Sequence, residues 1–202
     1  MSELDEIDNA IKNNPGKDVY LFNHARICNA LFVNVWEQGE IYHPGIKQVV
    51  TAALKTGHYD TTSLNVLMTD TTCYCSYFVA THKFWKEYMS FLKDVKIHLD
   101  SLSGEYKQMY EGSANYSRDK SLNMFPFIVE RLFSTYLHTS NYNIYSHPAD
   151  YTVYSNQIGH VADYVADIYE LKKRISSNDD LNEWNQKRNF VLQKYSTILS
   201  CD

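Results

Sequence analysis

The sequence predicts a mixed α/β fold, in which a small sheet of about three to five strands packs against helices and a helical pair ends the chain. Short apolar runs bounded by turn residues alternate with longer segments in which apolar residues recur every three or four positions. The chain has 202 residues, with no internal repeat and no low-complexity tract, which suits one domain. We therefore expect an α/β domain at residues 1–155 and a C-terminal helical pair at residues 156–202, packed on the same domain.

Turn residues divide the N-terminal half of the chain into its expected elements. Ser2 and Asp5 favour the start of a first helix. Pro15 and Gly16 end it, because proline lacks a backbone donor and glycine accepts positive φ. The apolar run at residues 18–22 then predicts a buried strand. The elements expected after it are a helix at residues 25–35, a helix that begins near Pro44, and strands at residues 64–68 and 72–79.

The strongest helix prediction covers residues 81–99. Thr81 suits the cap, and aromatic and aliphatic residues recur at three and four positions after it. We expect Trp85 and Leu92 to be buried against the sheet. Asn178 is expected to cap the last helix. The other elements expected are a loop or short helix at residues 104–118, a helix at residues 126–138, strands at residues 143–146 and 152–154, and two helices joined at residues 176–180.

Charge and hydropathy exclude several classes of protein. The net charge is −5 and the lysines and arginines are scattered, whereas a nucleic-acid partner requires a basic surplus on one face. The densest cluster, residues 172–174, is expected to be a solvated helix end. No apolar run approaches the roughly 20 residues of a membrane span. The acidic N-terminal residues lack the basic and apolar regions of a signal peptide, so a cytoplasmic location is expected.

The sequence identifies no metal site and no cofactor. We expect Cys28, Cys73, Cys75 and Cys201 to be free thiols in a reducing cytosol. The Cys73-x-Cys75 pair lacks the second half that a metal site of this kind needs. Glycine-rich phosphate-binding signatures and the common hydrolase motifs are absent from the sequence.

Residues 34–45 place polar side chains beside a tryptophan at the junction of two expected helices. Trp36, Gln38, Glu40 and His43 lie there among two glycines and a proline. Hydrogen-bonding side chains next to an aromatic ring suit a sugar, which presents hydroxyl rims and apolar C–H faces. A second interpretation makes this segment a helix–loop–helix corner, with Trp36 in the core and Glu40 capping the next helix.

A second candidate region combines residues 75–85, a strand leading into a helix, with the helix at residues 125–134. Glu130 and Arg131 are the charged pair among the apolar residues of that helix. Such a pair forms either a buried structural ion pair or a site at the edge of the sheet, and the residues alone favour the structural role. Neighbouring helix positions point about 100° apart. We expect Arg131 to be the one that turns toward the sheet edge and a pocket.

Three motifs together resemble a known family. "QGE-x-x-HPG", "SYFVA-x-x-x-FW-x-x-Y" and "FPF-x-x-ERLFS-x-YL" are similar to the acceptor-side region of bacterial and phage glycosyltransferase-like proteins of polysaccharide gene sets, which have a GT-A-like fold. The resemblance covers roughly residues 18–137 and lacks the Asp-x-Asp motif and the Rossmann-like half of such enzymes. It implies a minimal or split form, in which Ser76, Tyr77, Glu130 and Arg131 lie near a site that Glu40 and His43 face.

The resemblance implies glycosyl transfer from a nucleotide sugar to a glycan or lipid-linked acceptor. Glu40 or Asp70 would then deprotonate the acceptor hydroxyl, and Arg131 would offset phosphate charge. Trp36 and Tyr77 would stack on sugar rings. The alternative function is a non-enzymatic binding or assembly protein that meets a protein partner through a surface rich in the chain's 17 tyrosines. One pocket lined jointly by Glu40, His43, Ser76 and Arg131 favours the enzyme, and scattered positions favour the alternative.

Overall fold

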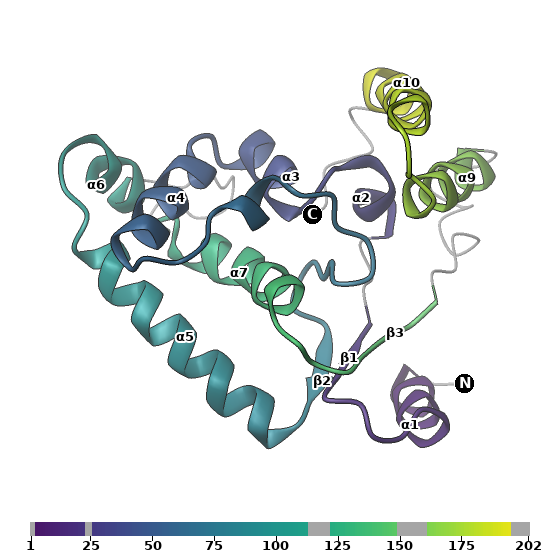
Figure 1. Cartoon of the computed structure of the whole chain (residues 1–202), viewed down its shortest axis with the longest axis horizontal. Coiled ribbons are helices and arrows are strands. Elements are labelled where there is room, and N and C mark those ends of the chain that lie inside the picture. The colour runs from purple at the N-terminus through teal and green to yellow at the C-terminus, as the bar shows by residue number, and fades with distance from the viewer. Residues whose placement is uncertain (1–2, 23–25, 113–121, 149–160, 195–202) are drawn as a thin grey trace.

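The computed structural model describes residues 3–22, 26–112, 122–148 and 161–194, and it confirms the mixed α/β fold. Helices dominate the described residues and surround a small sheet (Figure 1). The elements are, in chain order, α1 (Glu3–Asn13), β1 (Val19–Leu21), α2 (Arg26–Leu31), α3 (Val35–Tyr42), α4 (Ile46–Thr56), the 3₁₀ helix η1 (Thr62–Asn65), β2 (Phe78–Ala80), α5 (His82–Asp100), α6 (Gly104–Glu111), α7 (Phe125–Thr139), β3 (Ile144–Ser146), α9 (Val161–Lys173) and α10 (Asn178–Lys194).

The sheet has the strand order β2-β1-β3, with β1 antiparallel to β2 and parallel to β3. All three residues of β1 are buried, because the sheet is covered on both faces. Val19 and Leu21 pack into a cluster with side chains of α5 and α7, whereas Tyr20 points to the other face and packs against α1. This alternation is the period of two that a strand imposes on its side chains. The expected strand at residues 18–22 is therefore confirmed in type and position.

A larger core joins the helices. Side chains of α2, α3, α4, α5, α7, α9 and α10 contribute to one continuous buried cluster. α9 and α10 lie beside α2, on the side of the molecule away from α5 and α6 (Figure 1). The Trp184 indole donates to the carbonyl of Ala30 at 3.1 Å, and Arg188 pairs with Glu37 at 2.8 Å. The C-terminal helical pair is thus anchored on α2 and α3 by its aromatic and cationic side chains.

Lys172 corrects the expectation of a solvated helix end. Its side chain is 1% exposed, and its Nζ donates to the carbonyls of Asn29 and Phe32, each at 2.7 Å. These carbonyls lie at the C-terminal end of α2, where backbone acceptors lack helical partners and attract a cation. Burial lowers the pKa of Lys172 to about 7, an effect that the nearby Glu37 partly opposes. Lys173 is exposed, as expected for the rest of this cluster.

Two expected elements near the middle of the chain have different forms. The helix expected at residues 25–35 is shorter and ends with α2 at Leu31, and a new helix, α3, begins at Val35, because the Asn34 side chain accepts from the backbone N–H groups of Trp36 and Glu37. No strand forms at residues 64–68, where one was expected, and the first two of these residues belong instead to the 3₁₀ helix η1. Its buried residues, Ser63 and Leu64, face the core from one tight turn rather than alternating along a strand.

Of the strand expected at residues 72–79, only the end is present, as β2. Cys75 and Ser76 have φ values of 58° and 54°, in the left-handed region, so the chain turns there and cannot extend. The strand expected at residues 143–146 is confirmed as β3. The strand expected at residues 152–154 lies outside the described residues.

The long helix α5 confirms one prediction and corrects another. It begins after Thr81, whose side chain accepts from the Phe84 N–H. Trp85 is 40% exposed and Leu92 is only partly buried, although both were expected to be buried against the sheet. Phe84, with no exposed surface, takes that position instead. At the start of α10, the hydroxyl of Ser177 accepts from the Asp180 N–H, so Ser177 rather than Asn178 supplies the cap.

Candidate functional site

Arg131 lies between α7 and α3 and not at an open pocket. Its Nε donates to the Val35 carbonyl at 3.0 Å, and its Nη2 donates to the Gln38 Oε1 at 2.5 Å. Its Nη1 donates to the Phe127 carbonyl at 3.0 Å. The side chain is 4% exposed, and burial lowers the pKa of its guanidinium, a shift that Glu130 partly opposes. The donors of the guanidinium are therefore engaged inside the protein, contrary to the expectation that Arg131 faces a pocket.

Trp36 and Gly39 complete this helix–helix contact. The Trp36 ring has no exposed surface, and its Nε1 donates to the Thr135 hydroxyl at 2.8 Å. A Cβ placed on Gly39 would collide with the Arg131 guanidinium, so glycine is what allows α7 to approach α3. The stacking of Trp36 on a sugar ring does not fit this position. The structure agrees instead with the interpretation of a helix corner that has Trp36 in its core.

His43 is also buried at this contact. Its ring lies 3.8 Å from the Phe127 ring, measured between centroids, and its Nδ1 has no hydrogen-bond partner among the described residues. Burial, and then the charge of Arg131, lower the pKa of His43 to about 4. The ring is therefore neutral near pH 7, which removes a second cation from the neighbourhood of the guanidinium.

Glu40 has the structural position that the second interpretation gave it. One carboxylate oxygen accepts from the Gly45 N–H at 3.0 Å and the other accepts from the Lys47 N–H at 2.6 Å. These contacts satisfy backbone donors at the start of α4, which otherwise lack partners. Gly45 has a φ of 89°, which a residue with a Cβ rarely adopts. Glu40 thus caps α4, and it remains partly exposed.

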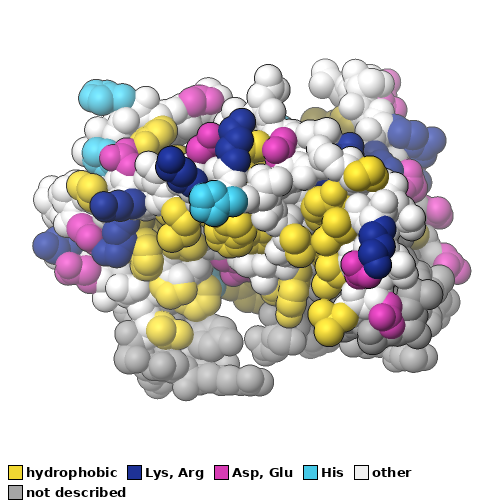
Figure 2. Space-filling view, turned by 90° about the horizontal axis from the view of Figure 1, so that it is seen from below, with side chains coloured by type: hydrophobic (Ala, Val, Ile, Leu, Met, Phe, Trp, Pro, Cys, Tyr) yellow, Lys and Arg dark blue, Asp and Glu magenta, His cyan; other side chains and the backbone are white. Residues whose placement is uncertain are grey.

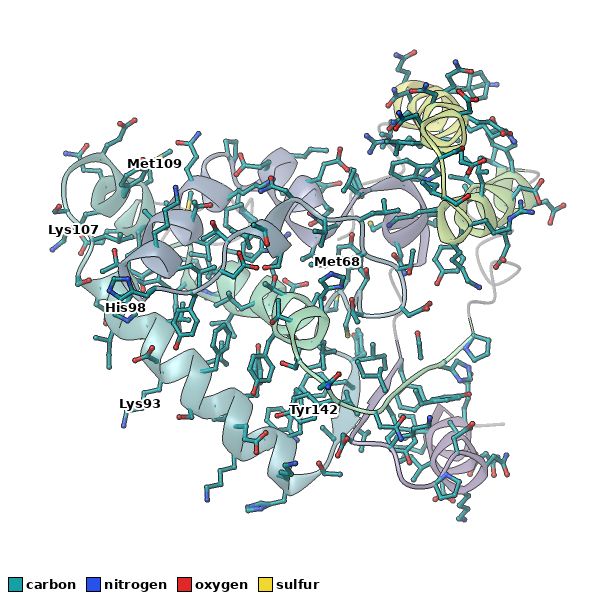
Figure 3. The ribbon with its side chains drawn as sticks, viewed as in Figure 1. Met68, Lys93, His98, Lys107, Met109 and Tyr142 are labelled. Atoms are coloured by element: carbon teal, nitrogen blue, oxygen red, sulfur yellow. The ribbon has the colours of Figure 1, made fainter. Side chains whose placement is uncertain are left out.

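Glu40 also lines an open pocket of about 660 Å³. We call it the polar pocket, and its walls are formed by Glu40, Lys47, Gln48, Thr51, Ala52, Lys55, Asn65 and Tyr106. These residues come from α3, α4, η1 and α6. Figure 3 shows α6 beside α4, with Met109 between the two helices. Among the described residues, neither Lys47 nor Lys55 has an ion-pair partner.

The turn before β2 carries the other residues predicted from the resemblance. Glu130 Oε1 accepts from the Cys75 N–H at 2.8 Å and holds the turn against α7. Ser76 and Tyr77 are exposed, and Tyr77 retains half of its accessible surface. Asp70 is exposed as well, and it lines neither of the pockets described in this section.

Ser76 lines a second hollow, which we call the apolar groove. It has a volume of about 430 Å³ and is formed by Ser76, Phe78, Trp85, Tyr88, Met89, Leu92, Lys93, Lys96, Phe125 and Val129. It shares no residue with the polar pocket. Glu40 therefore lies at one pocket, Ser76 at another, and His43 and Arg131 in the protein interior. Neither of these two pockets brings the four residues together.

The described cysteines are free thiols, and residues 195–202, which include Cys201, lie outside the description. Cys28 and Cys73 are buried and Cys75 is exposed. Burial raises the pKa of Cys73 to about 12, so this thiol is protonated and a poor nucleophile.

Within residues 3–22, 26–112, 122–148 and 161–194, His, Cys, Asp and Glu side chains form no group of three that could hold a metal ion. No helix in the same residues is long and apolar enough to cross a membrane.

No protein-family model, curated protein or solved structure matches this chain. The interpretation of the site therefore depends on the geometry of the residues themselves.

The sequence did not identify Lys47, Lys55 and Tyr106 as residues of the polar pocket. A signal for the first two was present, because Lys47, Thr51 and Lys55 are four positions apart and so share one helix face. No sequence pattern places Tyr106 at this pocket, because its position there depends on how α6 packs against α4.

Proposed function

We propose that this chain is a glycosyltransferase-like protein that binds an anionic sugar, a nucleotide sugar or a sugar phosphate, in the polar pocket. The observation that carries the proposal is a row of two lysines without ion-pair partners along one wall of the pocket, with an exposed tyrosine ring among the same lining residues. Unpaired ammonium groups attract phosphate as point charges. The resemblance of the sequence motifs to glycosyltransferase-like proteins points to the same class of ligand.

The geometry of α4 suits a ligand with charge at one or two points. Lys47 and Lys55 are eight positions apart, which corresponds to about 12 Å along a helix. Flexible lysine side chains at that spacing can converge on one phosphate or bind two separate anionic groups. Thr51 lies between them and lines the pocket, and because its hydroxyl donates to the Lys47 carbonyl at 2.6 Å, its oxygen is left to act as an acceptor.

The remaining lining residues suit the sugar. Tyr106 is 44% exposed, and a tyrosine ring packs well on the apolar C–H face of a hexose. Gln48 and Asn65 are exposed amides, each with donors and an acceptor for hydroxyl groups. The position of Glu40 at the same pocket makes it the candidate base for transfer to an acceptor hydroxyl, because it is the carboxylate among the lining residues.

A specific observation favours the second candidate, a binding protein without catalysis. Both oxygens of Glu40 already accept backbone N–H groups, and Asp70 lies elsewhere. Under this alternative the polar pocket holds its ligand and no bond is broken. The two candidates share the binding site and differ in turnover.

The test is a thermal-shift screen of the full chain against a panel of nucleotide sugars and sugar phosphates, followed by calorimetry. A ligand at 100 times its dissociation constant stabilises by about 2.7 kcal/mol. The double variant Lys47→Ala/Lys55→Ala should lose this stabilisation. Lys12→Ala, an exposed lysine on α1, is the matched control and should retain it. Failure of the whole panel, or an equal loss in the control, contradicts the proposal.

Turnover separates the two candidates. Release of nucleoside diphosphate from a bound nucleotide sugar, abolished by Glu40→Gln with the fold intact, supports glycosyl transfer. Binding without any release in the presence of acceptor glycans supports the non-enzymatic protein.

A further inference from the structure

The apolar groove runs along α5 from Trp85 to Lys96, beside the edge strand β2 and the first turns of α7. Trp85, Met89 and Leu92 line it from α5, at positions separated by four and three residues. Phe125 and Val129 line it from α7, and Phe78 forms its floor by stacking on Phe133 at 3.9 Å between ring centroids. The groove is therefore built on buried aromatic residues of the sheet cluster, with a rigid helix on each side.

The apolar lining of the groove reaches the surface of the protein. Trp85 and Met89, which line it from α5, retain 40% and 54% of their accessible surface. Hydrophobic side chains gather across the middle of the molecule when it is seen from below, and basic and acidic side chains lie around them (Figure 2). Exposed apolar side chains gathered at a hollow are typical of an interaction site on a folded protein.

The charges at the groove are all of one sign. Lys93 and Lys96 line it, and none of its described lining residues is acidic. Lys93 extends from α5 into solvent (Figure 3) and has no ion-pair partner among the described residues, whereas Lys96 pairs with Asp100 at 2.6 Å. Glu130, on the α7 side, is held by the Cys75 N–H and Arg131. Lys93 is therefore the lining lysine whose charge no described acidic residue balances.

We propose that the apolar groove binds an acidic amphipathic helix of a partner protein. Trp85 to Leu92 spans about two helical turns, which matches apolar side chains at i, i+3 or i+4, and i+7 on an opposing helix. Acidic residues beside that apolar row would meet Lys93 and Lys96, which sets the register and speeds association. The groove and the polar pocket share no residue, so this proposal is independent of the sugar ligand.

Two other occupants fit the groove less well. A second copy of the chain, paired face to face, would bring the same Lys93 and Lys96 together and meet repulsion. A membrane surface is bound by apolar side chains that project into the interface. Here Phe78, Phe125 and Val129 line a hollow that side chains from a folded partner can fill.

The experiment measures the fluorescence anisotropy of a labelled synthetic helical peptide of about 18 residues, with a leucine row flanked by glutamates. The full chain should bind this peptide, and binding should weaken as salt increases. Met89→Asp should raise the dissociation constant by about tenfold or more. Ile97→Asp is the matched control, because Ile97 is an equally exposed apolar residue of α5 that does not line the groove. It should change the constant by less than about twofold.

Charge specificity is tested in both partners. A peptide with lysines in place of the glutamates should fail to bind the wild type, and Lys93→Glu should weaken the acidic peptide by about fivefold. Lys83→Glu, an exposed lysine of α5 away from the groove, is its control. Circular dichroism confirms that each variant is folded.

Four outcomes overturn the proposal. They are no binding of the acidic peptide, equal binding of the basic one, equal weakening by Ile97→Asp, and occupancy by another class of partner. The last is shown by vesicles of phosphatidylcholine and phosphatidylglycerol that bind the chain while the peptide does not. It is also shown by a dimer in sedimentation velocity that Met89→Asp dissociates.

Discussion

The helices α7 and α5 carry similar aromatic and charged residues but use them in opposite ways. α7 lies between the helix core and the sheet cluster, and its polar residues Arg131, Ser134 and Thr135 are buried with hydrogen-bond partners. α5 is covered on one face only, and it leaves Trp85 and Met89 exposed. The difference teaches that residue type does not decide burial here. What decides it is whether a helix has neighbours on one side or on several.

The largest expected loss of stability is at Trp36, which is buried, whereas Trp85 on α5 is partly exposed. Trp36→Ala removes a side chain without exposed surface and leaves the Thr135 hydroxyl without its indole donor. We expect a loss of about 3–5 kcal/mol in the free energy of unfolding, as for other buried aromatic truncations. Urea unfolding at a fixed pH measures it. A loss below about 1 kcal/mol would show that this corner of α3 is not part of the cooperative core.

Lys172 is buried like Arg131, and its lowered pKa makes the free energy of unfolding depend on pH. In the folded protein it titrates near pH 7, whereas in the unfolded chain it keeps its proton up to about its ordinary pKa of 10.5. Between these values the unfolded chain binds more protons, so the free energy of unfolding rises with pH, by up to about 1.4 kcal/mol per unit. Relative to Lys172→Met, the wild type should therefore gain stability between about pH 7 and 9.

Urea unfolding of both proteins at each pH gives the difference, and Lys173→Met is the control at an exposed neighbour. A pH-independent difference would mean that Lys172 stays charged in the folded state, held by the carbonyls of Asn29 and Phe32.

Arg131→Lys tests whether the buried guanidinium acts in folding or in ligand binding. A lysine ammonium cannot reach the carbonyls of Val35 and Phe127 and the Gln38 side chain together, so buried acceptors lose donors. We expect a loss of about 2 kcal/mol in the free energy of unfolding. Sugar binding should not change, because Arg131 does not line the polar pocket. Normal stability with weakened binding would restore the ligand role that sequence reasoning gave it.

Sequence periodicity predicted the long helices well because each has a continuous apolar stripe. α5 and α7 were expected within a few residues of their ends, and the C-terminal pair was expected to be joined at residues 176–180, close to the observed start of α10. η1 was missed because Leu64 and Met68 are four positions apart, and a short apolar run fits a strand or a helical turn equally well. The break between α2 and α3 depends on the Asn34 side chain, whose capping contacts are local but have no periodic signature.

The candidate site was less predictable than the fold. Glu40 was identified from its segment, and its capping role was one of two interpretations that the residues allowed. Lys47 and Lys55 were not identified, because lysines on one helix face are typical of a solvated surface. Their place at a pocket depends on α6 and η1, which meet α4 only in three dimensions. Arg131 was expected at a pocket but is buried. Its position depends on the packing of α7 against α3, where Gly39 leaves room for the guanidinium.

Trp85→Ala should have the smallest effect on stability and is the direct counterpart of Trp36→Ala. The Trp85 ring is 40% exposed and stacks on Phe78 at 4.9 Å between centroids, so its truncation removes one partly buried contact and leaves no enclosed cavity. We expect a loss of about 1 kcal/mol in the free energy of unfolding, measured in the same urea series. The same variant should weaken the acidic peptide clearly, because the exposed part of the ring forms the wall of the apolar groove. A stability loss above about 3 kcal/mol would place Trp85 in the core after all. A small loss with unchanged peptide binding would remove Trp85 from the proposed contact, which would then rest on Met89 and Lys93 among the α5 residues tested.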